Sequence, residues 1–133
     1  MSFKTFGFTL LETVIVLAMG AILISLSYSS YQHYLMKAAR MNAQVMLWQT
    51  ASYLENYYSE HGTYQGVSLN SPTITEDGRY RLVLSHISKS AYILSAIPQK
   101  AQLQDKKCAA LYLNEKNEQW HDGLELKSSC WIQ

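Results

Sequence analysis

The strongest constraint on how this chain can fold is a run of 19 residues, 8–26, in which one carboxylate is the only ionisable group. An α-helix rises about 1.5 Å per residue, so a helix of this length nearly crosses the hydrocarbon core of a bilayer. The carboxylate belongs to Glu12, the fifth residue of the run, where a charge costs roughly 3 kcal/mol or more on membrane-insertion scales. Because a charged residue in such a segment normally has a partner, we interpret Glu12 as a functional residue.

Two other interpretations of the apolar run stay open. A secretory signal peptide has a shorter apolar region, of about 7–15 residues, that ends at a site of small residues. The triplet Ser25-Leu26-Ser27 could serve as such a site. A plain single-pass membrane anchor needs only the length of the run. Neither interpretation accounts for Glu12 or for the Gly7-Phe8 junction at the start of the run.

Helical periodicity continues beyond the apolar run, because mostly apolar residues recur at alternating spacings of three and four. This stripe consists of Met36, Ala39, Ala43, Met46, Thr50, Tyr53 and Tyr57, widened by Leu47, Leu54 and Tyr58. The polar residues that lie on the other side are Arg40, Gln44, Ser52, Glu55 and Ser59. Gly62 is a suitable C′ residue, so we predict one helix from Phe8 to about His61, roughly 80 Å long at the standard rise.

The rest of the chain has the features of a small sheet. Residues 63–78 are rich in Gly, Ser, Asn and Thr, a composition that predicts a loop. Apolar segments predict strands at 80–84, 91–97 and 109–113, and a polar turn follows at 114–117. About three antiparallel strands with one apolar face would pack against the helical stripe. The expected fold class is therefore α+β, in a single domain without internal repeats.

Composition and motifs argue against an enzyme. The chain has 133 residues and a net charge of +1, so the totals show no strong attraction to nucleic acid or to an anionic membrane. The histidines His33, His61, His86 and His121 lack metal-ligand spacing. No glycine-rich phosphate loop, HExxH or GxSxG motif occurs in the sequence. We therefore expect no catalytic residues, no cofactor and no metal site.

One short segment could contact a nucleic-acid backbone. Arg79 and Arg81 flank a tyrosine, and basic residues interleaved with aromatic ones occur at such contacts. The segment is equally ordinary as the start of a strand, and we expect the adjacent Glu76 and Asp77 to cancel both arginines, so DNA contact is a weak alternative. The C-terminal lysines are also balanced by acids. The lysines are Lys100, Lys106, Lys107, Lys116 and Lys127, and the acids are Asp105, Glu115, Glu118, Asp122 and Glu125.

The two cysteines, Cys108 and Cys130, lie in the C-terminal quarter, with 21 residues between them. If this region leaves the cytoplasm, a disulfide is their default state, and two free thiols are the alternative. A bond across this separation would stabilise the fold by about 3 kcal/mol in the loop-entropy model.

The segment Gly7-Phe8-Thr9-Leu10-Leu11-Glu12 resembles the class III signal of type IV prepilins and pseudopilins. This resemblance implies that a membrane prepilin peptidase cleaves between Gly7 and Phe8 and methylates the new amine of Phe8. It also implies that Glu12 docks subunits, and pairing with a neighbour's N-terminal amine would lower the cost of both charges in lipid. Lys4 in the short leader agrees with the positive-inside bias.

Later segments extend the resemblance to type IV pilins, most closely to PilE-type minor pilins. These segments are Tyr57-Tyr58, Gly62-Thr63-Tyr64, Asp105-Lys106-Lys107-Cys108, Leu111-Tyr112-Leu113 and Cys130-Trp131. The resemblance implies a leader at 1–7, a transmembrane and assembly helix at 8–27, and a periplasmic head at 28–133 that contains the second half of the helix. It further implies that a Cys108–Cys130 disulfide bounds the C-terminal region of the pilin fold.

The function that the resemblance implies is that of a structural minor pilin, needed for assembly of a type IV pilus and for twitching motility, adhesion or DNA uptake. Its partners would be the prepilin peptidase, the major pilin, other minor pilins and the inner-membrane assembly platform. The subunit would span the inner membrane once before assembly and be extracellular afterwards. A pilin that acts as a receptor for DNA or a surface, a type II secretion pseudopilin and a major pilin stay open as alternatives.

Overall fold

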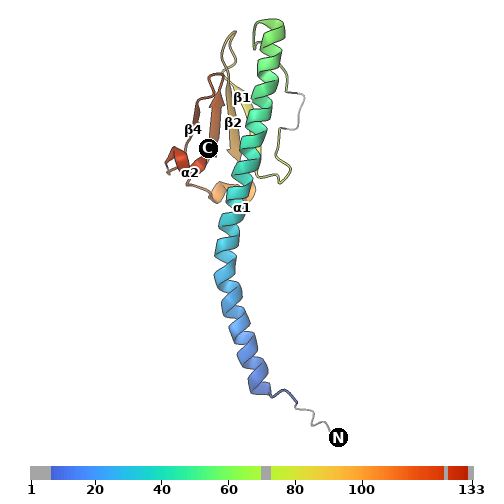
Figure 1. The fold of residues 1–133 in the computed structure, drawn as a ribbon, viewed down its shortest axis with the longest axis vertical. Coiled ribbons are helices and arrows are strands. Elements are labelled where there is room, and N and C mark those ends of the chain that lie inside the picture. Colours follow the sequence, from blue (N-terminus) through green and yellow to red (C-terminus); the bar gives the residue numbers. More distant parts are fainter. Residues whose placement is uncertain (1–6, 70–72, 125, 132–133) are drawn as a thin grey trace. The chain divides into compact units, whose positions relative to one another are not determined.

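The computed structural model describes residues 7–69, 73–124 and 126–131 (Figure 1). The predicted leader residue Lys4 lies outside this part of the chain. The chain divides into two compact units, residues 1–35 and 36–133. We call the second of these the head unit.

The long helix α1 (Leu10–His61) has 52 residues and passes through both units. Within the first unit its large apolar side chains are exposed from Leu10 to Leu26. By length and composition, α1 is the one described helix that is long and apolar enough to cross a membrane. The helix begins two residues later than predicted, at Leu10 rather than Phe8, because Thr9 takes the N-cap position.

The predicted end of α1 is confirmed. The helix ends at His61, and Gly62 adopts the left-handed backbone conformation, with φ +67°. The backbone N–H of Gly62 donates to the carbonyl of Tyr58 at 2.7 Å, which satisfies one of the last carbonyls of the helix.

The head unit contains one antiparallel sheet in the order β1-β2-β3-β4. The strands are β1 (Tyr80–Ser85), β2 (Ile93–Pro98), β3 (Leu111–Asn114) and β4 (Gln119–His121). The first three strands were predicted, with ends that differ by one or two residues, and β4 was not. A short 3₁₀ helix, η1 (Lys100–Gln104), lies between β2 and β3 in the chain, and α2 (Lys127–Cys130) follows β4. Figure 1 shows the sheet beside the second half of α1.

The core of the head unit lies between α1 and one face of the sheet. Its fully buried apolar residues include Ala39, Ala43, Leu47 and Leu54 from α1, and Tyr80, Leu94, Ala96, Leu111 and Leu113 from the strands. The two alanines of α1 belong to the same buried cluster as the strand residues. The expected α+β fold is thereby confirmed.

Two residues of α1 were assigned to the wrong face of the helix. Tyr53 was assigned to the apolar face but is 39% exposed, whereas Gln44 was assigned to the polar face but is 1% exposed. The Gln44 amide can be buried because its Nε2 donates to the carbonyl of Cys130 at 2.6 Å. Burial here follows from where the C-terminal segment crosses the helix.

The predicted disulfide is confirmed. Cys108 and Cys130 are bonded, with Cα atoms 5.5 Å apart, and both are buried. The next residue, Trp131, donates from its indole N–H to the carbonyl of Trp120 in β4 at 3.3 Å, and its ring lies 6.5 Å from that of Trp48 on α1. The disulfide therefore holds the C-terminal segment between the helix and the edge of the sheet.

Candidate functional site

The N-terminal residues that were predicted to function in processing and assembly lie at the exposed start of α1. Thr9 caps the helix, because its Oγ1 accepts a hydrogen bond from the backbone N–H of Glu12 at 3.2 Å. Glu12 therefore lies in the first turn, where the positive end of the helix dipole favours a carboxylate. The Thr9-x-x-Glu12 spacing is a capping signal in the sequence, and it gives Glu12 a local role that sequence reasoning missed.

Gly7 and Phe8 precede the helix in an open setting. A Cβ atom on Gly7 would meet no atom within 4 Å, and Phe8 is 78% exposed. Cleavage between these residues, methylation of Phe8 and docking through Glu12 stay predictions.

The two predicted arginines share one face of the sheet. Arg79 and Arg81 flank Tyr80 at the start of β1, and the two-residue period of a strand places both opposite the buried tyrosine ring. Arg81 is exposed and Arg79 is half-buried. The structure thus brings both arginines together at an edge strand, and their contact with DNA stays a prediction.

Asp77 forms no ion pair with either arginine, although the charge of Arg79 contributes to lowering the pKa of Asp77, and cancellation of the two arginines by Glu76 and Asp77 stays a prediction. The Asp77 carboxylate accepts hydrogen bonds from the hydroxyl of Thr75 at 2.5 Å, the backbone N–H of Arg79 at 3.0 Å and the amide of Asn42 at 3.4 Å. Burial is the largest single influence on the pKa of Asp77 and raises it, but these hydrogen bonds together hold the pKa below its ordinary value. No ion pair joins Arg79 or Arg81 to a described carboxylate.

A lysine that was not predicted as a site residue lies beside Arg79. The backbone N–H of Gln99 donates to the carbonyl of Arg79 at 2.7 Å, which extends the β1–β2 pairing and places Lys100 beside Gly78. The ammonium Nζ of Lys100 lies 3.1 Å from the position that a Cβ on Gly78 would take. Only the strand register brings these residues together, so the sequence held no signal for the pair.

A buried ion pair fixes η1 and the segment after it against α1. Arg40 donates from Nε and Nη2 to the two carboxylate oxygens of Asp105, at 2.5 and 2.8 Å. The amide of Gln102 lies within hydrogen-bond distance of Asp105, of the Tyr80 hydroxyl and of the Met36 carbonyl. Asp105 was expected to balance the C-terminal lysines, and Arg40 was assigned to the polar side of the helix. Both assignments were wrong, because the two side chains meet in space.

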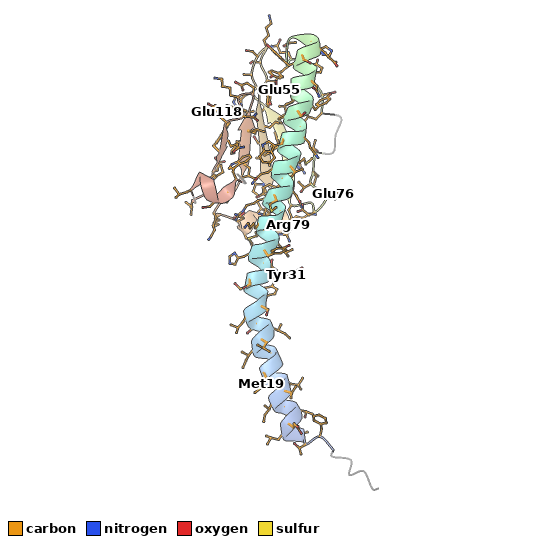
Figure 2. All side chains as sticks on the ribbon, viewed as in Figure 1. Met19, Tyr31, Glu55, Glu76, Arg79 and Glu118 are labelled. Atoms are coloured by element: carbon orange, nitrogen blue, oxygen red, sulfur yellow. A yellow bond between two sulfur atoms is a disulfide. The ribbon has the colours of Figure 1, made fainter. Side chains whose placement is uncertain are left out.

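A cluster of tyrosines surrounds Glu55 in another part of the head unit. Tyr64 and Tyr92 donate from their hydroxyls to Oε1 of Glu55, at 2.9 and 3.4 Å. Burial, together with Glu55, raises the pKa of both hydroxyls. Figure 2 shows Glu55 toward the end of the head unit where α1 terminates and Arg79 toward the other end. Glu55 and Arg79 therefore lie toward different ends of the unit.

Among residues 7–69, 73–124 and 126–131, no group of three His, Cys, Asp or Glu side chains gathers in a way that could hold a metal ion.

Comparison with protein families gives one match that covers most of the head unit. The family model described as "Type IV minor pilin ComP, DNA uptake sequence receptor" matches residues 29–112. No curated protein sequence matches the chain significantly.

Two solved structures share the fold. A type IV pilin from Shewanella oneidensis is 26% identical, with a TM-score of 0.54, and the match covers 74% of this chain and 99% of that one. The non-core minor pilin PilV from Neisseria meningitidis is 21% identical, with a TM-score of 0.59, and the match covers 73% of this chain and 94% of that one. Because PilV is only 21% identical, its similarity to this chain shows a shared fold and nothing further.

Proposed function

Because this chain belongs to the ComP family of type IV minor pilins, we propose that it is a pilus subunit that binds duplex DNA during DNA uptake. The observation that carries the proposal is the family match, which extends from residue 29 on α1 to residue 112 on β3. The match includes Arg79, Arg81 and Lys100, whose charges no described carboxylate pairs with. The family and fold are those of structural pilins, and we propose no enzymatic activity.

The apolar first part of α1 fits anchoring in a membrane and incorporation into a pilus. We propose the finer order of events that the N-terminal motif implies. A leader of residues 1–7 is removed by the prepilin peptidase, residues 8–27 hold the subunit in the inner membrane, and residues 28–133 form the periplasmic head. The subunit then joins the major pilin and other minor pilins through the assembly platform.

Processing is tested by intact-mass and N-terminal analysis of native protein extracted from membranes. We expect the chain to begin at Phe8 and to carry one methyl group on its amine. A native chain that begins at Met1, or near Tyr28 as after signal-peptide cleavage, would contradict the proposed processing.

Docking through Glu12 is tested with Glu12→Gln, which removes the charge and keeps the size of the side chain. Because the neutral side chain enters lipid more easily, we expect normal membrane insertion. We expect roughly a tenfold or greater loss from sheared pili, which corresponds to about 1.4 kcal/mol. The matched control is Glu60→Gln, on the exposed surface near the end of α1. Normal recovery of Glu12→Gln in pili would refute the docking role.

DNA binding is tested with the full chain in nonionic detergent micelles and a fluorescent duplex. We expect an affinity that falls steeply as salt concentration rises, since phosphate contacts release counterions. Absence of binding at low salt would rule out the receptor proposal. A deletion strain separates the alternatives, since loss of DNA uptake supports the proposal, whereas loss of protein secretion would identify a secretion pseudopilin.

A further inference from the structure

Two contacts hold η1 and the residue after it against the part of α1 where the head unit begins. The side-chain amide of Gln102 donates to the carbonyl of Met36 at 3.3 Å, and Nη2 of Arg40 donates to Oδ1 of Asp105 at 2.8 Å. Figure 1 shows η1, drawn in orange, at this end of the head unit. The contacts therefore bring segments near residues 36–40 and 102–105 together at one end of the unit.

Three of the residues that directly follow these contact residues are exposed. Lys37 follows Met36 and is exposed, as is Lys106, which follows Asp105. Leu103 follows Gln102 and is 63% exposed. We call Lys37, Leu103 and Lys106 the basal patch.

The composition of the basal patch suits the surface of a bilayer. A single exposed leucine needs no explanation. A leucine accompanied by lysines is typical of protein surfaces that place an apolar side chain at the boundary of the acyl chains while ammonium groups meet the lipid phosphates. Leu103 favours a bilayer over DNA as the partner, because an apolar side chain adds nothing to a contact with phosphates in water.

The lysines of the basal patch keep their charge. Neither Lys37 nor Lys106 forms an ion pair with a described carboxylate. On α1 no acid occurs at any position from 13 to 54. Asp105, the acid next to Lys106, is occupied by Arg40. The patch therefore complements a negatively charged surface.

The turn before β1 adds no net negative charge to this end of the unit. Its acids are Glu76 and Asp77, and two arginines, Arg79 and Arg81, follow them in the sequence. The charges of these four side chains sum to zero whatever contacts they make. Lys100, the exposed first residue of η1, adds a further positive charge. The excess charge beside the basal patch is therefore positive.

The length of the chain keeps this end of the head unit near the membrane. The proposed membrane segment ends at residue 27, and the head unit begins at Met36. The helix α1 is continuous over these nine residues and advances over them by about 14 Å. The residues between include exposed Tyr28, Tyr31 and Tyr34, and tyrosine is enriched at the interface between membrane and water. This limit depends on chain length alone and holds for any orientation of the head unit.

We propose that the basal patch docks the head unit on the surface of the anionic bilayer in which the chain's own apolar segment is anchored. This inference rests on the proposed anchoring of residues 8–27 in a membrane. Leu103 enters the interfacial layer, and Lys37 and Lys106 bind lipid phosphates. The contact holds the head of an unassembled subunit at the membrane.

The test uses the full chain in nanodiscs of phosphatidylcholine, alone or mixed with phosphatidylglycerol. Gln104→Cys, at an exposed position of η1, carries a polarity-sensitive dye, with the native disulfide left oxidised. We expect blue-shifted emission and weaker quenching by iodide in the anionic nanodiscs, reversed at high salt. Lys37→Gln/Lys106→Gln should lower the ratio of docked to undocked heads about 30-fold, because each basic residue near an anionic surface contributes about 1 kcal/mol. Leu103→Gln should keep the dependence on anionic lipid and give a smaller blue shift.

Two controls lie at the other end of the sheet, where Ser85 pairs with Ile93 and Ile93 with Asn114. Ile87→Cys, at a 41% exposed residue just beyond β1, carries the same dye and should show equal emission in both kinds of nanodisc. Lys116→Gln, at an exposed lysine in the turn after β3, should leave the signal of the Gln104→Cys dye unchanged.

The outcomes separate the docking from the anchoring on which it rests. If the chain does not enter nanodiscs, the anchoring and the docking are both overturned. If it enters and the Gln104→Cys dye reports the same environment in both lipids, the docking alone is wrong. An equal loss in Lys116→Gln and in the double variant would show a diffuse charge effect and would also overturn the docking. A shift caused by added duplex DNA, with none from anionic lipid, would assign this end to nucleic acid instead.

Discussion

Asp105 lies next to Lys106 and Lys107 in the sequence, yet its carboxylate pairs with Arg40, which is 65 residues away. Asp77 also has partners other than the charged side chains near it in the sequence. Its carboxylate binds the hydroxyl of Thr75 and the backbone N–H of Arg79 rather than an arginine side chain. At the residue scale, counting nearby charges therefore gave the wrong partners. The Asp77 carboxylate binds the backbone N–H of Arg79, and the Asp105 carboxylate binds the side chains of Arg40 and Gln102.

The buried pair predicts a large effect of Asp105→Asn. This change leaves the partly buried Arg40 without its counter-charge, and the two side chains are only 14% and 1% exposed. We expect the free energy of unfolding to fall by about 3 kcal/mol or more, measured by urea denaturation of the full chain in detergent. Lys106→Gln, a change at the exposed neighbouring residue, should stay within about 0.5 kcal/mol of wild type. A similar small effect of Asp105→Asn would show that the pair adds little stability.

At the scale of elements, β4 depends on what surrounds it. Three residues are too few for a strand pattern, but pairing with β3 and the stacked rings of Tyr112 and Trp120, 5.4 Å apart, hold the segment in place. The disulfide and the Trp131 hydrogen bond then fix the chain that follows. Gly123 lies so close to the Lys107 carbonyl that a Cβ atom would clash with the backbone there. The C-terminal region is therefore packed by close contacts as well as by a covalent link.

The double variant Cys108→Ala/Cys130→Ala should lose about 3 kcal/mol of stability, because the unfolded chain regains the entropy of a loop closed over a separation of 22 residues. Urea denaturation measures the loss, and reduction of the wild-type protein should reproduce it. We also expect no reactive thiols in the unreduced, denatured wild-type chain. Two reactive thiols, or an unchanged unfolding midpoint in the variant, would contradict a structural bond.

On the scale of the whole molecule, the head unit separates its charged groups. Arg79 and Glu55 lie toward different ends of the unit (Figure 2), and the glutamate is surrounded by tyrosine hydroxyls. Neutral tyrosines can donate to a carboxylate, but ionised ones would repel it. This arrangement ties the stability of the unit to the protonation of its buried tyrosines.

Alkaline pH should therefore unfold the head unit. Burial raises the pKa of Tyr80 to about 12, compared with about 10 in an unfolded chain. A raised pKa means that the stabilisation is complete below about pH 10 and is lost as pH rises toward 12. We expect Tyr80→Phe to show a weaker loss of stability over that range in denaturation curves, and exposed Tyr28→Phe to match wild type. An identical pH dependence in Tyr80→Phe and wild type would contradict this assignment.

The sequence alone determined the long helix, its end at Gly62, three of the strands and the identity of the two bonded cysteines. These features depend on local signals, namely periodicity, a glycine suited to positive φ, and the presence of only two cysteines.

Only the tertiary structure decided the burial of Gln44, the strand β4, the Arg40–Asp105 pair and the approach of Lys100 to Gly78. The burial of Gln44, the Arg40–Asp105 pair and the approach of Lys100 to Gly78 depend on segments that are far apart in the chain. The strand β4 depends on its pairing with the neighbouring strand β3. Local propensity carries no information about such contacts, because the energy of a hydrogen bond or ion pair depends on the distance between its groups in space and not on their separation in the sequence. These contacts therefore become visible only in the folded chain.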